Sequence, residues 1–192
     1  MTNTVTKIKQ SALALIVEKG YTATSLADIG EKVGIKKQSI YSHFKSKDDL
    51  FLQVMRDVVH EEITFLKNYF TQYKNETLNF ILYNFIIQLK ERFVSYKEDN
   101  LRFLFRMMFI PPNHLQEIVV STAMEYYGEL KDHIGQIFAM HEDKIAVTAI
   151  EGKTAYLNFF DGLLVELVYI DVRNFEERLQ VSWKIFQRGI EK

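Results

Sequence analysis

Residues 24–47 read TSLADIGEKVGIKKQSIYSHFKSK, and the spacing of their apolar side chains predicts two short helices joined by a tight turn. Leu26, Ile29 and Val33 follow one another at intervals of three and four, so they mark the inner face of the first helix. Gly34 stands where the chain must turn sharply, a place that suits a residue tolerant of positive φ. The second helix turns Ile40 and Phe44 inward. This pattern is typical of a helix-turn-helix, whose second helix enters the major groove of DNA.

The second helix of this pattern has a polar outer face, formed by Lys37, Gln38, Tyr41 and Ser42. Glutamine can pair bidentately with adenine and lysine can donate to guanine, while hydroxyl and ammonium groups hold phosphates. We therefore expect this helix to contact both the bases and the backbone of double-stranded DNA.

The charge of the chain is unevenly distributed, although the net charge is only −1. Residues 1–47 carry eight lysines against three acidic residues, a net charge of +5. The remaining residues carry 16 basic and 22 acidic side chains, a net charge of −6. A basic N-terminal segment attached to an acidic body is what a compact phosphate-binding module requires.

The composition is that of a folded protein without thiol chemistry, since 47% of the 192 residues are apolar and none is cysteine. The lack of cysteine removes disulfides and thiolate metal sites, and it fits a reducing cytoplasm. No signal peptide is expected, because the apolar stretch near the N-terminus is short. The apolar run at residues 156–170 contains Asp161 and Glu166 and is shorter than the roughly 20 residues that span a bilayer. We expect a cytoplasmic protein with no membrane partner.

The fold class follows from periodicity. Strand-like alternation is nearly absent, which predicts an all-α protein with about nine helices. The expected organisation is a three-helix DNA-binding head with the helix-turn-helix, residues 1–47. A larger helical ligand-binding and dimerisation domain follows, residues 48–192.

Local signals predict where these helices begin and end. Gly20 should end the first helix, and Ser46 with Asp49 three residues later should cap the fourth. Asn75 and Asn174 are the expected N-caps of two later helices. The expected helices cover residues 7–19, the pair in the helix-turn-helix, and then 46–70, 75–96, 100–109, 113–140, 144–170 and 174–190.

Residues 1–47 carry a connected set of short motifs by which the chain resembles the TetR family of one-component bacterial repressors. The motifs are Gly20-Tyr21, Thr24-Ser25-Leu26 before Ile29, Val33-Gly34-Ile35, Ile40-Tyr41-Ser42-His43-Phe44 and Lys45-Ser46-Lys47 before Leu50. The rest of the chain agrees with the family in length and in the number and order of helices.

The resemblance implies roles for individual residues. Tyr41 and His43 would contact phosphates from the recognition helix, and Lys47 would do so from the start of the fourth helix. Thr24 would both cap the second helix and touch the DNA backbone. The base preference would lie in the variable positions, which are Lys36, Lys37, Gln38, Ser39 and Ser42.

Two positions depart from the family pattern. Lys36 stands where the family often has a small hydroxyl residue that caps the recognition helix, and a lysine side chain cannot accept a backbone N–H. Gly30 stands where the family often has alanine, which favours a close crossing of helices but costs up to about 1 kcal/mol of helix propensity.

Aromatic and methionine side chains are abundant in the body of the chain. They either fill a helical core or line an adaptable apolar pocket for a small effector. The candidate ligand-binding residues are Phe80, Tyr83, Phe103, Met107, Tyr127 and Phe159.

The last two expected helices carry apolar stripes. Such a pair either packs on its own body or forms half of an intermolecular four-helix bundle. The resemblance, and the need to bind two half-sites, favour a homodimer. The candidate interface residues are Tyr156, Phe159, Leu163, Leu167, Leu179, Trp183 and Phe186.

The pattern as a whole predicts a ligand-responsive transcriptional regulator, most simply a repressor that binds a palindromic operator and is released by a small apolar or amphipathic effector. We expect no catalytic site, cofactor or metal, since His60-Glu61 lacks a second histidine at zinc-protease spacing. A DNA-binding protein of this fold without a ligand, or an all-α ligand carrier or enzyme, are the alternatives. The effector, the operator and the choice between repressor and activator stay open.

Overall fold

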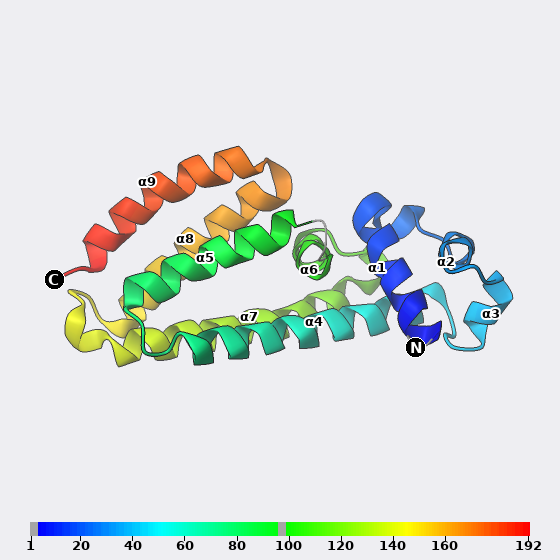
Figure 1. Cartoon of the computed structure of the whole chain (residues 1–192), viewed down its shortest axis with the longest axis horizontal. Coiled ribbons are helices and arrows are strands. Elements are labelled where there is room, and N and C mark those ends of the chain that lie inside the picture. Colours follow the sequence, from blue (N-terminus) through cyan, green and yellow to red (C-terminus); the bar gives the residue numbers. More distant parts are fainter. Residues whose placement is uncertain (1–3, 96–98) are drawn as a thin grey trace. The chain divides into compact units, whose positions relative to one another are not determined.

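The computed structural model describes residues 4–95 and 99–192 (Figure 1). Within these ranges the chain forms nine α-helices, two short 3-10 turns and no β-strand, so the all-α prediction is confirmed. The helices are α1 (Thr4–Ala23), α2 (Leu26–Val33), α3 (Lys37–Tyr41), α4 (Lys47–Gln72), α5 (Leu78–Val94), α6 (Asn100–Phe109), α7 (Gln116–Met140), α8 (Ala149–Tyr169) and α9 (Val172–Ile190). None of these described helices is both long and apolar enough to cross a membrane.

The described residues pack into two compact units. The first unit comprises the described parts of Met1–Glu62 and Lys97–Glu125, and the second those of Ile63–Tyr96 and Tyr126–Lys192. α4 and α7 each supply residues to both units.

The first unit is built around α1. Ile8, Ala12 and Ile16 are buried along one face of this helix. At Gly20 the backbone leaves the helical region (φ 86°, ψ 162°), as predicted for the end of the first helix, and a further turn follows it. L-residues rarely adopt this conformation, so the break requires glycine. The guanidinium of Arg106, on α6, donates to the carbonyl of Val17 (2.9 Å) and so ties α6 to α1.

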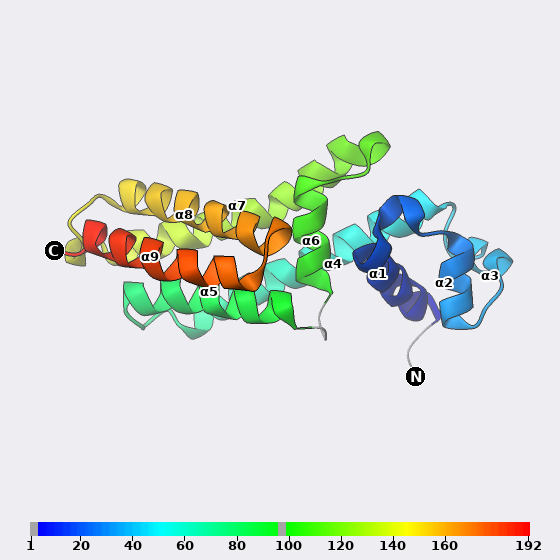
Figure 2. The ribbon, with the colours of Figure 1, turned by 90° about the horizontal axis from the view of Figure 1, so that it is seen from above.

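The second unit is a bundle in which α8 and α9 form an antiparallel hairpin alongside α5 (Figures 1 and 2). The buried Tyr156 of α8 donates its hydroxyl to the carbonyl of Leu82 on α5 (2.9 Å). The rings of Phe85 and Phe160, from the same two helices, lie 5.8 Å apart. The stripe of α8 is therefore turned into the core of its own chain.

Several predicted helix starts are wrong, because a neighbouring side chain makes the cap. Thr77, not Asn75, accepts the backbone N–H of Phe80 and caps α5. Asp171, not Asn174, caps α9. The helix expected from residue 144 begins instead after Thr148, which forms a reciprocal capping box with Glu151. The predicted end of the fifth helix at Tyr96 lies outside the described residues, and α5 ends at Val94.

Gly152 marks a close approach of α8 to α7. A Cβ atom added there would lie 2.4 Å from the ring of the buried Phe138. Gly128, on α7, has no other atom within 4 Å of the same added position. Gly152 is therefore packed closely against a neighbouring helix, whereas Gly128 is not.

The variant Gly152→Ala is expected to lower the free energy of unfolding by about 1–3 kcal/mol, because overpacking outweighs a gain in helix propensity of up to about 1 kcal/mol. The matched variant Gly128→Ala gains the propensity without the clash and is expected to stabilise the protein. Chemical denaturation of both variants measures the difference. Equal stability changes would contradict the close approach of α8 to Phe138.

Candidate nucleic-acid interface

The start of α2 is fixed by a capping box rather than by Thr24. The Oγ atom of Ser25 accepts the backbone N–H of Asp28 (3.2 Å), and the Asp28 carboxylate accepts the backbone N–H of Ser25 (2.9 Å). Thr24 is only 1% exposed and donates its hydroxyl to the carbonyl of Gly20 (2.8 Å). The prediction that Thr24 caps the helix is therefore wrong. Its burial also argues against a phosphate contact, whereas the Ser25 hydroxyl at the helix end is exposed.

The turn between α2 and α3 has the geometry that the sequence predicts. Gly34 is left-handed (φ 78°, ψ 30°), and its N–H donates to the carbonyls of Glu31 and Gly30. The N–H of Ile35 also donates to the Gly30 carbonyl (2.9 Å). A Cβ atom added at Gly30 would lie 2.7 Å from the carbonyl oxygen of Ile35, so the glycine at this unusual position allows the tight turn.

The recognition helix α3 is short, and buried apolar side chains anchor its inner side. Ile40 and Phe44 are buried, as predicted, with exposed fractions of 0% and 1%. Lys36 is the N-cap residue and makes no side-chain capping bond, which confirms that this helix end lacks a cap. The Ser42 hydroxyl donates to the carbonyl of Ser39 (2.7 Å) and closes the last turn.

The outer face of α3 and its flanks is a continuous row of exposed polar side chains. The exposed residues of the predicted set are Lys36, Lys37, Gln38, Ser39, Tyr41, Ser42 and His43. The Nζ atom of Lys37 lies 5.9 Å from the centre of the Tyr41 ring, and Tyr41 is 51% exposed. The other two residues of the predicted set are Thr24, which is buried, and Lys47, which is half-buried. We name this row the α3 face.

Lys47 lies at the first position of α4 and is half-buried. Its Nζ atom stands 4.0 Å from the centre of the Tyr21 ring. Burial lowers the pKa of the Lys47 ammonium, while the carboxylates of Asp48 and Asp28 act in the opposite direction. The predicted cap of α4 is confirmed, because the backbone N–H of Asp49 donates to the Oγ atom of Ser46 (3.0 Å).

A cluster around Tyr21 fixes the start of α4 and was not predicted. Tyr21 donates its hydroxyl to the Asp48 carboxylate, and burial followed by this hydrogen bond raises the pKa of the phenol. The same ring packs edge-on against Phe51 (4.8 Å between centres). Tyr21 and Asp48 are 27 positions apart, so only the folded chain brings them together.

The six predicted ligand-binding residues are divided between the two units. Phe103 and Met107 belong to the first unit, where Phe103 is fully buried 5.7 Å from the Phe51 ring. The other four belong to the second unit. Tyr127 donates to Asp161 (2.8 Å), and Phe80 is 44% exposed. The prediction of Phe103 as a pocket residue is corrected to core packing.

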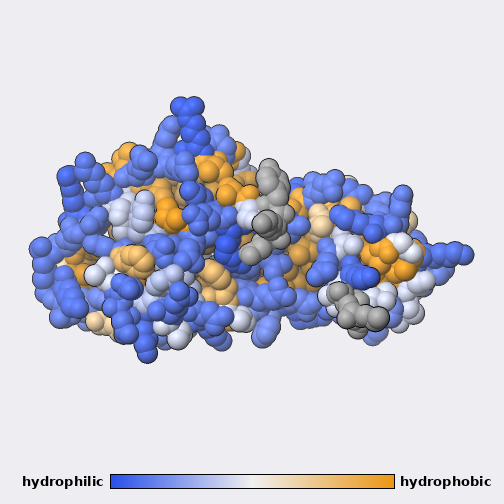
Figure 3. All heavy atoms as spheres, viewed as in Figure 1, coloured by the Kyte–Doolittle hydropathy of each residue, from blue (hydrophilic) through white to orange (hydrophobic). Residues whose placement is uncertain are grey.

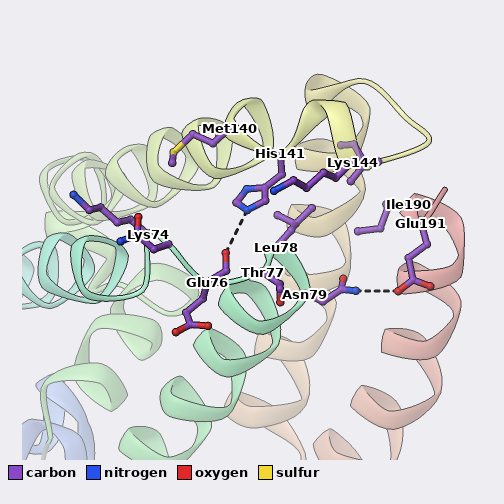
Figure 4. Close-up of a pocket in the computed structure, with 12 residues that line it drawn as sticks. Lys74, Glu76, Thr77, Leu78, Asn79, Met140, His141, Lys144, Ile190 and Glu191 are labelled. Carbon is purple, nitrogen blue, oxygen red and sulfur yellow. Dashed lines mark hydrogen bonds between the residues drawn. The ribbon is translucent and has the colours of Figure 1, made fainter.

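The second unit has a hollow of about 400 Å³ at the end of its bundle, away from the predicted aromatic residues (Figure 4). The buried ring of His141 lies between two carbonyl oxygens, of Ile137 (2.9 Å) and Glu76 (3.3 Å). Asn79 donates to Glu191 (2.9 Å) across the same hollow. The walls carry both signs of charge, from Lys74, Lys144, Glu76 and Glu191.

Most of the predicted dimer-interface residues pack inside their own chain. Tyr156, Leu163, Leu167 and Leu179 are buried by at least 94%. Trp183 lies against Tyr83 of α5 (5.0 Å), and Phe186 stacks on Phe159 (5.9 Å). The four buried residues thus belong to the core of their own chain, a correction to their predicted role as interface. Phe159, Trp183 and Phe186 are half-buried, and their role in an interface stays a prediction.

A different set of apolar residues of α8 and α9 faces outward. Val165 and Tyr169 are exposed at i, i+4 on α8, and Val181 and Ile185 at the same spacing on α9. Apolar residues lie among the polar ones over α9 in the space-filling view (Figure 3). We name these four residues the outer α8–α9 face.

Comparison of the sequence with known proteins identifies the N-terminal segment. Residues 8–54 match the family model of bacterial regulatory proteins, tetR family. The biofilm operon icaADBC HTH-type negative transcriptional regulator IcaR of Staphylococcus epidermidis is 36% identical over 81 residues. This match covers 42% of the chain and 44% of that relative, so less than half of the relative is spanned.

Solved structures share the fold over nearly the whole chain. A TetR-family transcriptional regulator from Agrobacterium tumefaciens superposes with a TM-score of 0.73 and 19% identity, covering 98% of each chain. The transcriptional regulator FadR from Bacillus subtilis, in complex with stearoyl-CoA, gives a TM-score of 0.66 and 14% identity over 96% of this chain and 98% of that one. The N-terminal segment therefore matches the tetR family of bacterial regulatory proteins, and the fold of the chain is similar over nearly its whole length to that of TetR-family regulators.

Proposed function

We propose that the protein is a cytoplasmic transcriptional repressor that binds a palindromic operator as a homodimer and is released by a small effector. The observation that carries the proposal is the α3 face, an exposed row of DNA-compatible side chains on a helix held by the buried Ile40 and Phe44. The staphylococcal relative is a negative regulator, which supports repression rather than activation.

Dimerisation is supported by the outer α8–α9 face. Val181 and Ile185 are 63% and 69% exposed one helical turn apart on α9, and Val165 and Tyr169 are a second exposed pair on α8. Exposed apolar side chains that share a helix face mark interaction sites, and a two-fold dimer presents two recognition helices to two half-sites. The functional division into residues 1–47 and 48–192 belongs to this proposal, and it need not coincide with the packing units.

A regulator without a small effector is the second candidate. It is favoured by the packing of two predicted ligand-binding residues, since Phe103 is buried in the core and Tyr127 is hydrogen-bonded to Asp161. An effector-responsive protein is supported by the Bacillus subtilis neighbour of the same fold, which was solved with stearoyl-CoA.

The variant Gln38→Ala tests the role of the α3 face. Gln38 is exposed, so its loss is expected to leave the fold intact and to relax base preference at one position in each half-site. A mismatched base pair at a position that the protein reads directly costs about 1–3 kcal/mol of binding free energy, and competition between operator variants measures this difference. An equal loss of affinity for all sequences would instead make Gln38 a phosphate contact.

A further inference from the structure

The first unit contains a hollow of about 720 Å³ beside the helix-turn-helix. Its walls come from the end of α1, the first residue of α4, the end of α6 and the loop that follows α6. The lining residues are Lys19, Gly20, Tyr21, Thr22, Ala23, Lys47, Arg106, Met107, Ile110, Pro111, Pro112, Asn113 and His114. We name it the α1–α6 hollow.

The charged side chains that line the α1–α6 hollow are all basic. Lys19 pairs with Asp28 outside the lining (2.7 Å), and the Nε2 atom of His114 lies 3.2 Å from Asp48. Lys47 and Arg106 make no ion pair within the described part of the chain. Two cations thus line one concave surface without a carboxylate within ion-pair distance, although the more distant carboxylates of Asp28 and Asp48 act on Lys47.

Both of these cations keep hydrogen-bond donors for a ligand. Arg106 uses one N–H on the Val17 carbonyl, and a guanidinium has five. The ammonium of Lys47 rests on the Tyr21 ring, whose face cannot replace the hydrogen bonds of water. Burial has already removed part of the hydration of Lys47, which strengthens its attraction to an oxyanion.

The opposite part of the lining is apolar. Met107 is buried at its base, Ile110 is 55% exposed, and Pro111 and Pro112 are half-buried beside it. An exposed isoleucine next to two prolines offers a surface for an aliphatic chain. Gly20 borders the same part of the hollow, where an added Cβ would make an ordinary contact with the Arg106 guanidinium at 3.8 Å.

We propose that the α1–α6 hollow binds an oxyanion with an aliphatic tail, the anionic head between Lys47 and Arg106 and the tail along Met107, Ile110 and Pro111. The inference deepens the proposed function, on which its regulatory part rests, by naming the class of effector and its site. Lys47 is also the predicted phosphate contact at the start of α4. A bound oxyanion therefore competes with a DNA phosphate for the same ammonium, and the ligand lowers DNA affinity through a shared side chain.

Calorimetric titration of the full-length protein tests the site without DNA. Decanoate below its micellar concentration is expected to bind, and decyl phosphate is expected to bind through its own anionic head. Decanol has no charge and decyltrimethylammonium is a cation, so both are expected to bind at least about tenfold more weakly. The ratio of the decanoate and decyl phosphate affinities distinguishes a carboxylate from a phosphate effector. Equal affinity for decanoate and decanol would overturn the proposal.

A matched pair of variants locates the ligand. Ile110→Glu places a carboxylate in the hollow and is expected to raise the dissociation constant of decanoate at least about tenfold, because like charges repel. Ile118→Glu makes the same change at a 43% exposed isoleucine of α7 outside the lining, and is expected to bind decanoate as the wild type does. Equal loss in both variants, or in neither, would overturn the site.

Arg106→Gln removes the charge but keeps an amide donor for the Val17 carbonyl. The variant is expected to weaken the binding of decanoate at least about tenfold and to leave the binding of decanol unchanged, since only the anion loses a charge-assisted hydrogen bond. Thermal unfolding checks that the variant is folded. If Arg106→Gln binds decanoate as tightly as the wild type, the assigned position of the anionic head is wrong.

Anisotropy of a labelled duplex, with and without decanoate, tests the regulatory part. Saturating decanoate is expected to lower DNA affinity in the wild type but not in Ile110→Glu. A wild-type protein that binds no DNA would refute the proposed function, while the calorimetry would still decide the site. Decanoate that binds in the hollow without changing DNA affinity would refute only the competition for Lys47.

Discussion

The affinity of the protein for duplex DNA is expected to fall about a thousandfold when salt rises from about 50 to about 200 mM. In the proposed dimer, Lys36, Lys37 and Lys47 of the two chains provide six ammonium groups near the recognition helices. Each phosphate neutralised releases a counterion, and the logarithm of the affinity falls linearly with the logarithm of salt, with a slope of about −0.9 per contact. Anisotropy titrations of a labelled duplex at several salt concentrations measure this slope.

Lys47→Ala removes two of these contacts from a dimer, so it is expected to make the slope shallower by about 2 and to weaken all sequences alike. Lys131→Ala is the matched control, because Lys131 is an exposed lysine on α7, outside the α3 face. An unchanged salt slope in Lys47→Ala would show that Lys47 does not contact a DNA phosphate. A flat salt response of the wild type would refute DNA binding by the α3 face.

Charges on the outer α8–α9 face are expected to convert the protein into a monomer. Val181→Glu combined with Ile185→Glu introduces carboxylates at positions that the single chain leaves exposed, so the fold of the monomer is expected to survive. A dimer would have to bury these charges, which is costly without partners. Loss of the second half-site is expected to lower operator affinity on the order of 10²–10⁴-fold. Sedimentation and operator titration measure the two effects.

Two controls separate dissociation from unfolding. Met124→Glu with Met140→Glu adds the same charge at exposed positions of α7 and is expected to leave the dimer intact. Leu163→Glu, at a residue that is 1% exposed, is expected to unfold the second unit instead of dissociating it. If the wild type sediments as a monomer at micromolar concentration and still binds its operator tightly, the outer α8–α9 face is not an interface.

The helix-turn-helix could be predicted because its signals are local. Ile40 and Phe44 lie within one helical turn of each other, and Gly34 is required by a positive φ. A local signal also marks the N-caps of α2 and α8, which the sequence analysis did not predict. Ser25 with Asp28 and Thr148 with Glu151 both have the spacing of a capping box, and both form one.

The dimer-interface prediction is wrong for its four buried residues because periodicity shows that a face is buried but not what buries it. The stripe through Tyr156 and Leu163 is as apolar as an interface would be, yet α5 and α9 of the same chain cover it. Composition likewise could not separate the core residue Phe103 from a pocket residue. Contacts such as Tyr21 with Asp48 join distant positions and carry no short-range signal.

Selection of duplexes from a random pool by the wild-type protein tests the central claim most directly, because it asks whether the α3 face reads DNA as part of a two-fold dimer. The account predicts enrichment of two inverted half-sites whose centres lie one helical turn, about 10–10.5 base pairs, or a multiple of it apart. Enrichment of no sequence, or of a single unpaired half-site, would contradict it.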